Sequence, residues 1–180
     1  MKIRIKEDEV SSAISQLKSQ MSAFMGGMED ALEDKSKDQK ESVVLTTASL
    51  LLALPAILGL IARLGKAMSS IIKRTIGTAS QNQNDAEKYF QQMGRIADEL
   101  HHLYIKPIEL IVRRFVKDPT KASKVANAIF HVIVAIMMIA SGVGAVKALK
   151  ANSINMATLE TALTAVKGGE VKTYLSKLIA

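Results

Sequence analysis

The chain has 180 residues, and its composition, 48% hydrophobic and 23% charged, excludes intrinsic disorder as the state of the whole chain. It contains no cysteine, which excludes disulfides and a zinc–thiolate site. Its net charge of +7 is unevenly placed, because residues 63–124 carry 12 basic and 6 acidic residues whereas residues 43–62 and 125–146 carry no charged residue.

Residues 1–42 are predicted to form an amphipathic helix followed by a charged linker. Apolar side chains recur in steps of three and four from Val10 to Ala31, which is a heptad pattern. The pattern predicts a helix from about Glu7 to Leu32 that packs against the rest of its own chain. Residues 33–41 are nearly all charged, with mixed signs, and we interpret them as a linker or a fully solvated turn of helix.

Residues 43–77 are predicted to form the first apolar helix, with an amphipathic extension that ends at Gly77. The uncharged part would be about 30 Å long as a helix, which matches the hydrocarbon core of a bilayer. A proline near its middle should kink it. The residues expected to face lipid or a protein core are Leu50, Leu51, Leu54, Pro55 and Leu58, and the basic residues that flank them are Arg63 and Lys66.

Residues 78–118 are predicted to form basic connecting helices. An amphipathic pattern indicates one helix that Pro107 should interrupt, followed by a short further helix. Asp118 followed by Pro119 is a strong helix start, because aspartate caps free amides and proline fits the first helical position. The basic residues that would flank the second apolar helix are Arg113, Arg114 and Lys117.

Residues 119–150 are predicted to form the second apolar helix, and residues 151–180 a pair of C-terminal amphipathic helices. The uncharged part of the first of these segments is 125–146, and its inward-facing candidates are Ile133, Ile136 and Ile139. Small residues near its end should let another helix approach closely, namely Ala140, Gly142 and Gly144. The C-terminal pair should cover about 155–167 and 170–179, separated by two glycines.

We recognise no catalytic, cofactor-binding or metal-binding site in the sequence, so we expect no enzymatic activity and no cofactor. Asp98 and His102 share a helix face, but no third metal ligand is apparent, and we interpret them as part of a polar face. His131 lies within the second apolar run. We favour a hydrogen-bonded core histidine there over a pH switch or pore-lining group in lipid. With no tryptophan, nucleic acid could be bound only through its backbone charge.

Two environments fit the apolar runs. Their length, lack of charge and basic flanks favour a bilayer, in which the positive-inside bias would place the connecting loop in the cytoplasm. A mean hydropathy of +0.17, and the absence of tryptophan or tyrosine at the ends of either run, favour two buried central helices in a soluble bundle or oligomer.

The first ten residues, Met1-Lys2-Ile3-Arg4-Ile5-Lys6-Glu7-Asp8-Glu9-Val10, resemble the start of small helical accessory or virion proteins of large tailed bacteriophages. The resemblance covers these ten residues of the chain. It implies a component of a virus particle, one that meets the host membrane during genome delivery, and it assigns no functional residue.

The sequence therefore predicts an all-α helical bundle with two long apolar, membrane-length helices and flanking amphipathic helices. The leading hypothesis is a non-enzymatic, membrane-active protein whose two apolar helices insert as a hairpin into an anionic bilayer. The alternative is a soluble self-assembling subunit of a virion or secretion machine that buries the same helices in protein interfaces. Both hypotheses include association into a homo-oligomer or with other assembly subunits, and the expected location is a membrane or a virion.

Overall fold

The computed structural model describes residues 7–38, 46–77, 83–141, 149 and 151–180, and these residues confirm the all-α fold. No strand occurs in the described ranges. The helices are α1 (Glu7–Asp38), α2 (Thr47–Thr75), α3 (Gln83–Arg113), α4 (Pro119–Ala140), α5 (Met156–Gly168) and α6 (Val171–Ile179).

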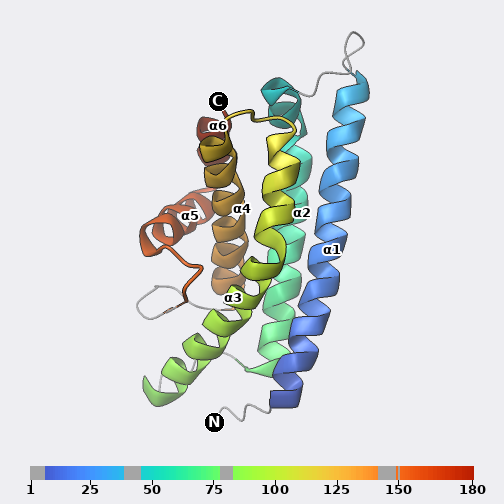
Figure 1. Cartoon of the computed structure of the whole chain (residues 1–180). Helices are drawn as coiled ribbons and strands as arrows, with labels where there is room; N and C mark the ends of the chain where they lie inside the picture. The colour runs from blue at the N-terminus through green and yellow to red at the C-terminus, as the bar shows by residue number, and fades with distance from the viewer. Residues whose placement is uncertain (1–6, 39–45, 78–82, 142–148, 150) are drawn as a thin grey trace.

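The four long helices form a bundle in which each successive helix reverses direction (Figure 1). Helix α1 packs against α2 and α3, and α4 packs against the same two helices from the other side. The two short helices lie outside this bundle and cover α4, with α6 also touching α2. Helix α4 is therefore surrounded by four neighbours, which explains why it is apolar nearly all round.

Helix α1 is longer than predicted and uses its heptad seam as expected. Val10, Leu17, Met21 and Met28 along the seam are buried against the bundle. The helix continues to Asp38, so the first part of the charged segment is helical rather than a linker.

Helix α2 begins at Thr47, where the Thr46 side chain accepts a hydrogen bond from the backbone amide of Ser49 (3.3 Å). The prediction began at residue 43, and residues 43–45 lie outside the described ranges. The helix runs through Pro55 without ending. Its last turn is closed by Gly77, whose φ of 87° lies in the left-handed region that glycine tolerates, as predicted.

The predicted break at Pro107 is wrong, because α3 is one helix from Gln83 to Arg113. Proline removes one amide donor but still fits helical φ, so a helix that packs against two neighbours can continue through it. The lost hydrogen bond would have ended on the carbonyl of Leu103, a residue with 40% of its surface exposed. Figure 1 shows α3 changing direction along its length.

Helix α4 starts as predicted and ends earlier than predicted. Asp118 accepts hydrogen bonds from the amides of Thr120 (2.9 Å) and Lys121 (3.3 Å), and Pro119 opens the helix. The helix ends at Ala140 with Ser141 as its cap, so it does not extend to residue 150. Gly142 and Gly144 lie outside the described residues, and Ala140 is half-buried. The two C-terminal helices are confirmed, separated by Gly169 at a φ of 69°.

Candidate functional site

The second apolar helix is enclosed by protein. Residues from Val125 to Met138 are buried almost without interruption, and Ile133, at the centre, has 0% of its surface exposed. Ile136 and Ile139 are partly buried and pack against the same core. In the folded chain this helix is therefore a core helix, although its length and composition would also suit a membrane span.

The first apolar helix has two different sides. Leu50 and Leu54 are buried, and Leu51 and Leu58 are partly buried against the core. The opposite side carries exposed residues that are uncharged until Arg63, namely Leu52, Pro55, Ala56 and Gly59. Pro55, predicted to face lipid or core, thus faces outward in the folded chain. The outer side of α2 is an apolar surface that no described residue covers.

The two apolar helices lie side by side and run in the same direction. Gly65 of α2 lies against Ile136 of α4, and Ser69 is hydrogen-bonded to Ser141 (3.0 Å), so the residue numbers increase together along the contact. Helix α3 makes this arrangement possible, because it returns the chain to the end at which α2 began. A membrane hairpin needs the two helices antiparallel, so the bundle is not a preformed hairpin.

The uncharged helical segments are shorter than the sequence runs. They comprise residues 47–62 of α2 and 125–140 of α4, each about 24 Å long at 1.5 Å per residue. A bilayer core is about 30 Å thick. Because α2 and α4 as whole helices are long enough to cross a membrane, a span would also include helical residues beyond the uncharged segments, on the side of Arg63 in α2 and of Lys124 in α4.

Close packing of α2 on α4 depends on one glycine. A Cβ atom added at Gly65 would lie 2.4 Å from Cγ2 and 2.7 Å from Cβ of Ile136. Gly65→Ala should therefore lower the free energy of unfolding by about 1–3 kcal/mol, because the two helices must move apart. Gly59→Ala, on the open side of α2 with nothing within 4 Å, should raise it by about 0.5–1 kcal/mol. Urea denaturation of both variants measures these changes in the free energy of unfolding. Equal changes for the two variants would contradict the close contact between Gly65 and Ile136.

The short segment before α5 is held to the bundle by two polar side chains. Asp98 of α3 accepts hydrogen bonds from the amides of Asn152 (3.1 Å) and Ser153 (2.7 Å), and from the Ser153 hydroxyl. His131 of α4 accepts a hydrogen bond at Nε2 from the amide of Asn155 (3.0 Å). The Asn155 side chain in turn caps α5 by accepting from the amide of Thr158 (3.0 Å). These contacts fix the start of the α5–α6 cover.

His131 has the predicted core role. It is fully buried, and its Nδ1 lies 2.7 Å from the carbonyl oxygen of Asn127, one turn earlier. Because Nε2 accepts from Asn155, the ring proton must be on Nδ1, where it is donated to that carbonyl. Both ring nitrogens are occupied by backbone groups, which leaves neither for a metal or for proton transfer.

The Asp98–His102 segment does not converge on a metal site. Asp98 turns to the segment before α5, while His102 is exposed. His101 packs edge-on against Phe130, with ring centroids 4.8 Å apart, and burial lowers the pKa of its imidazole. Among the residues the structure describes, no three histidine, aspartate or glutamate side chains are grouped to hold a metal ion.

The Asp98 contacts predict a pH dependence. Burial alone would raise the pKa of this carboxyl, but the hydrogen bonds from Ser153 and Asn152 hold it below its ordinary value. A carboxyl with a lowered pKa stabilises the fold above its unfolded-state pKa, and that contribution is lost as the pH falls below about 4.

Asp98→Asn should therefore be less stable at pH 7 and should lose less stability between pH 5 and 2 than the parent. Thermal melts against pH test this. Glu99→Gln, an equal charge change at an exposed neighbour, should keep the parental slope.

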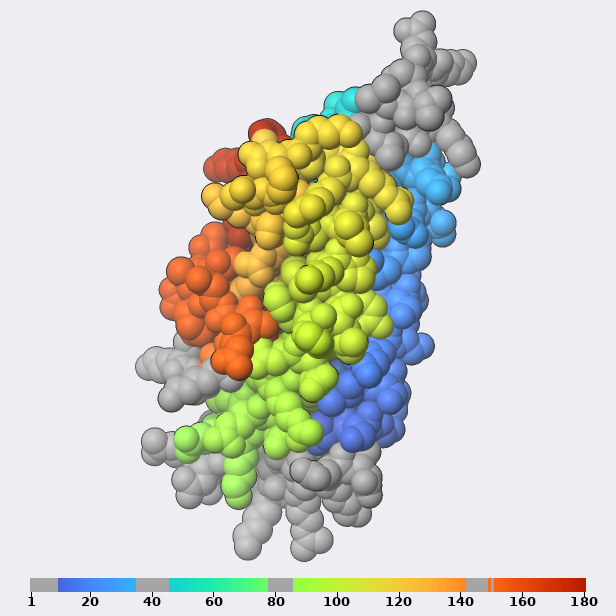
Figure 2. Space-filling model, viewed as in Figure 1, coloured from blue at the N-terminus to red at the C-terminus, as the bar shows by residue number. Residues whose placement is uncertain are grey.

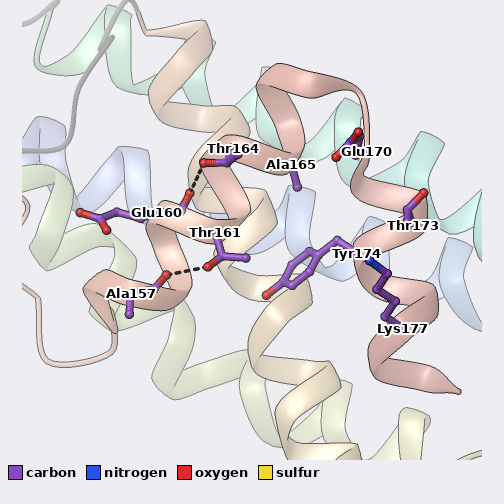
Figure 3. A pocket seen from close by; sticks show the side chains of 9 residues that line it. All are labelled: Ala157, Glu160, Thr161, Thr164, Ala165, Glu170, Thr173, Tyr174 and Lys177. Carbon is purple, nitrogen blue, oxygen red and sulfur yellow. Dashed lines mark hydrogen bonds between the residues drawn. The ribbon is translucent and has the colours of Figure 1, made fainter.

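A surface groove of about 550 Å³ between α5 and α6 was not predicted from the sequence. Figure 3 shows Tyr174 of α6 pointing toward α5, where the Thr161 and Thr164 hydroxyls each donate to a carbonyl of their own helix (both 2.9 Å). Burial raises the pKa of Tyr174. The lining also holds Glu160, Glu170 and Lys177, so acidic, basic and hydroxyl groups are mixed. The spacing of Thr161 and Thr164, three residues apart, could have indicated a polar face on α5. That this face lies opposite α6 is known only from the tertiary structure.

The predicted basic flanks do not form one cluster. Arg63 and Lys66 are exposed midway along α2. The other three, Arg113, Arg114 and Lys117, lie at the end of α3 and in the connection to α4, at the end of the bundle where α2 begins. Arg113 pairs with Glu109 (2.7 Å), and Arg114 pairs with Glu29 of α1 (3.2 Å). Lys117 is exposed in the short connection to α4. That connection meets the start of α2, since the Thr47 hydroxyl donates to the Phe115 carbonyl (3.1 Å).

Comparison with known proteins gave no match: no family model, curated protein or solved structure is significantly similar to this chain.

Proposed function

We propose that the chain is a non-enzymatic, membrane-active protein that stores its apolar helices in a folded bundle and releases them into an anionic bilayer. The observation that carries the proposal is the enclosure of α4. An apolar helix of membrane length is enclosed by α2, α3 and the short α5–α6 cover, which is attached through residues 151–155. Following the N-terminal resemblance, we place this activity in a phage virion that acts at the host membrane.

Release rather than simple insertion is proposed because α2 and α4 are parallel. Insertion as a hairpin requires the cover to detach and α4 to reverse against α2, with residues 63–124 as the connection. On insertion, apolar side chains would exchange protein contacts for lipid contacts, so the cost lies chiefly in opening the bundle. The connecting segment, net +6, would stay on the side of entry, and in the cytoplasm if the positive-inside bias holds.

Flotation of lipid vesicles tests the proposal. The protein should rise with vesicles that contain anionic lipid, and 1 M salt added after binding should leave most of it bound, because apolar burial is not screened. Neutral vesicles are the control and should bind far less. Complete recovery of monodisperse protein in the lipid-free fraction, with anionic vesicles present, would contradict the proposal.

A second candidate is a self-assembling structural subunit, and the outer side of α2 favours it. Leu52, with 56% of its surface exposed, lies on an uncharged helix face next to Pro55, Ala56 and Gly59. Such a face suits a protein neighbour as well as lipid. Under this function Leu52→Arg should reduce the oligomer size measured by sedimentation while the bundle stays folded. An oligomer of unchanged size would remove the face from the assembly.

A further inference from the structure

The outer face of α3 carries leucine and basic residues in one line. Leu103, Lys106, Leu110 and Arg113 follow one another in steps of three and four, so they share a face, and all four are exposed. Leu110 has 62% of its surface exposed and Leu103 40%. We call these four residues the α3 stripe. Figure 2 shows the C-terminal half of α3 forming the face of the molecule toward the viewer.

The rest of α3 is already committed to the bundle. The residues on the side of α3 that packs into the bundle are buried, namely Met93, Ile96, Leu100 and Ile108, and the stripe runs along the edge of this side. The helix therefore cannot turn its apolar side outward while the bundle is folded. The stripe is what the folded molecule offers, and it can bury two leucines to shallow depth only.

The chain segment that contains and follows the α3 stripe has an excess of basic residues. From residue 103 to 124 the chain carries six basic residues (Lys106, Arg113, Arg114, Lys117, Lys121, Lys124) and two acidic ones (Glu109, Asp118), a net of +4. Glu109 pairs with Arg113, and Asp118 is occupied in capping α4. Arg114 pairs with Glu29 of α1, and Lys121 donates to the carbonyl of Ala180. The exposed lysines of the segment are Lys106, Lys117 and Lys124. Glu99, one turn before Leu103, marks the end of the basic region.

We propose that the α3 stripe is the surface by which the folded protein first adsorbs to an anionic lipid bilayer, before any helix is released. This inference rests on the proposed function. Lys106, a cation between the exposed leucines Leu103 and Leu110, fits the boundary between acidic headgroups and acyl chains, where both kinds of group find partners. A phosphate backbone would use the cations alone and gives no reason for the leucines.

Adsorption and insertion should differ in their response to salt. The adsorbed state depends on charge, so 1 M salt, with a Debye length of about 3 Å, should detach protein that has not yet inserted. Inserted protein should remain bound. Short incubation at low temperature, before the bundle opens, isolates the first state.

The experiment is flotation with vesicles of phosphatidylglycerol and phosphatidylcholine, after short incubation, using Lys106→Gln combined with Leu110→Ser. Losing one cation near the surface costs about fivefold, and the leucine adds to this, so we expect at least about a tenfold fall in the partition coefficient. The control is Met156→Ser in α5 with Lys172→Gln in α6, which removes the same charge and another exposed apolar side chain, and it should bind like the parent.

Each outcome assigns a different failure. Equal binding by the stripe variant and the control would overturn the stripe while leaving the proposed function standing. Stripe-dependent adsorption with no insertion after long incubation would support the stripe and contradict helix release. If double-stranded DNA displaces the vesicles and Leu110→Ser alone binds normally, the surface is a phosphate-binding one and the lipid assignment is overturned. Absence of any binding by the parent would contradict both.

Discussion

Leu54→Arg is expected to unfold the bundle, whereas Leu52→Arg, two residues earlier in the same helix, is expected to leave it folded. Leu54 has 1% of its surface exposed and Leu52 56%. An unpaired charge at Leu54 should cost about 3–5 kcal/mol, a large part of the 5–15 kcal/mol that typically stabilises a domain. At Leu52 the arginine can reach water.

Circular dichroism melting of the two variants measures this difference. The Leu54 variant should lose most of its cooperative transition, and the Leu52 variant should melt within a few degrees of the parent. Equal melting temperatures would mean that α2 does not present these two sides in solution. The pair also distinguishes a membrane span from a core helix. In a helix surrounded by lipid an arginine is unfavourable at both positions, whereas in a core helix with one exposed side it is unfavourable at Leu54 alone.

Ile133→Ala is expected to destabilise the folded protein by about 2–5 kcal/mol and, under the proposed function, to hasten its insertion into anionic vesicles. Ile133 is fully buried at the centre of α4, so truncation leaves a cavity in the core. Since release requires the bundle to open, a weaker bundle should open more often.

The series Ile133→Val and Ile133→Ala provides a graded control. Valine should cost about 0.5–1.5 kcal/mol, so insertion should be fastest for alanine, then valine, then the parent. Urea denaturation gives the stabilities, and time-resolved flotation in 1 M salt gives the insertion rates. Rates that do not follow stability would show that opening of the bundle does not limit insertion.

Local sequence patterns predicted the helices well because each helix has its own period and its own stop. The heptad steps from Val10 to Met28 match the buried side of α1, and Gly77 and Gly169 end their helices in the left-handed conformation. Pro107 misled the prediction, because proline weakens a helix locally while contacts with α1 and α4 hold α3 together.

The arrangement of the helices could not be predicted in the same way. A membrane span and the central helix of a bundle can have uncharged segments of the same length, so the sequence does not distinguish the two. In this fold α4 is recognised as a central helix by the packing of α2, α3, α5 and α6 around it. Helices α2 and α4 run parallel because α3, a long helix between them, returns the chain to the end at which α2 began. The hairpin hypothesis instead assumed that the two apolar helices are antiparallel.

The polar contacts that attach the cover also depend on tertiary structure. Asp98 and Ser153 are 55 positions apart in sequence, and His131 and Asn155 are 24 apart. Asp98 was interpreted from the sequence as part of a polar helix face rather than as a metal ligand, and its role as a hydrogen-bond acceptor for backbone amides leaves no sequence pattern. His131 was assigned to the core correctly because a histidine inside an apolar helix needs local hydrogen bonds.

The measurement that tests helix release most directly uses a single tryptophan in α4. The chain contains no tryptophan, so Phe130→Trp places one fluorophore at a position with 1% exposure. Lipids brominated deep in their acyl chains quench tryptophan only on contact. We expect no quenching with neutral vesicles, and strong, salt-resistant quenching after incubation with anionic ones. Unquenched fluorescence from a folded variant that floats with anionic vesicles would contradict release, because α4 would then have stayed in the protein core.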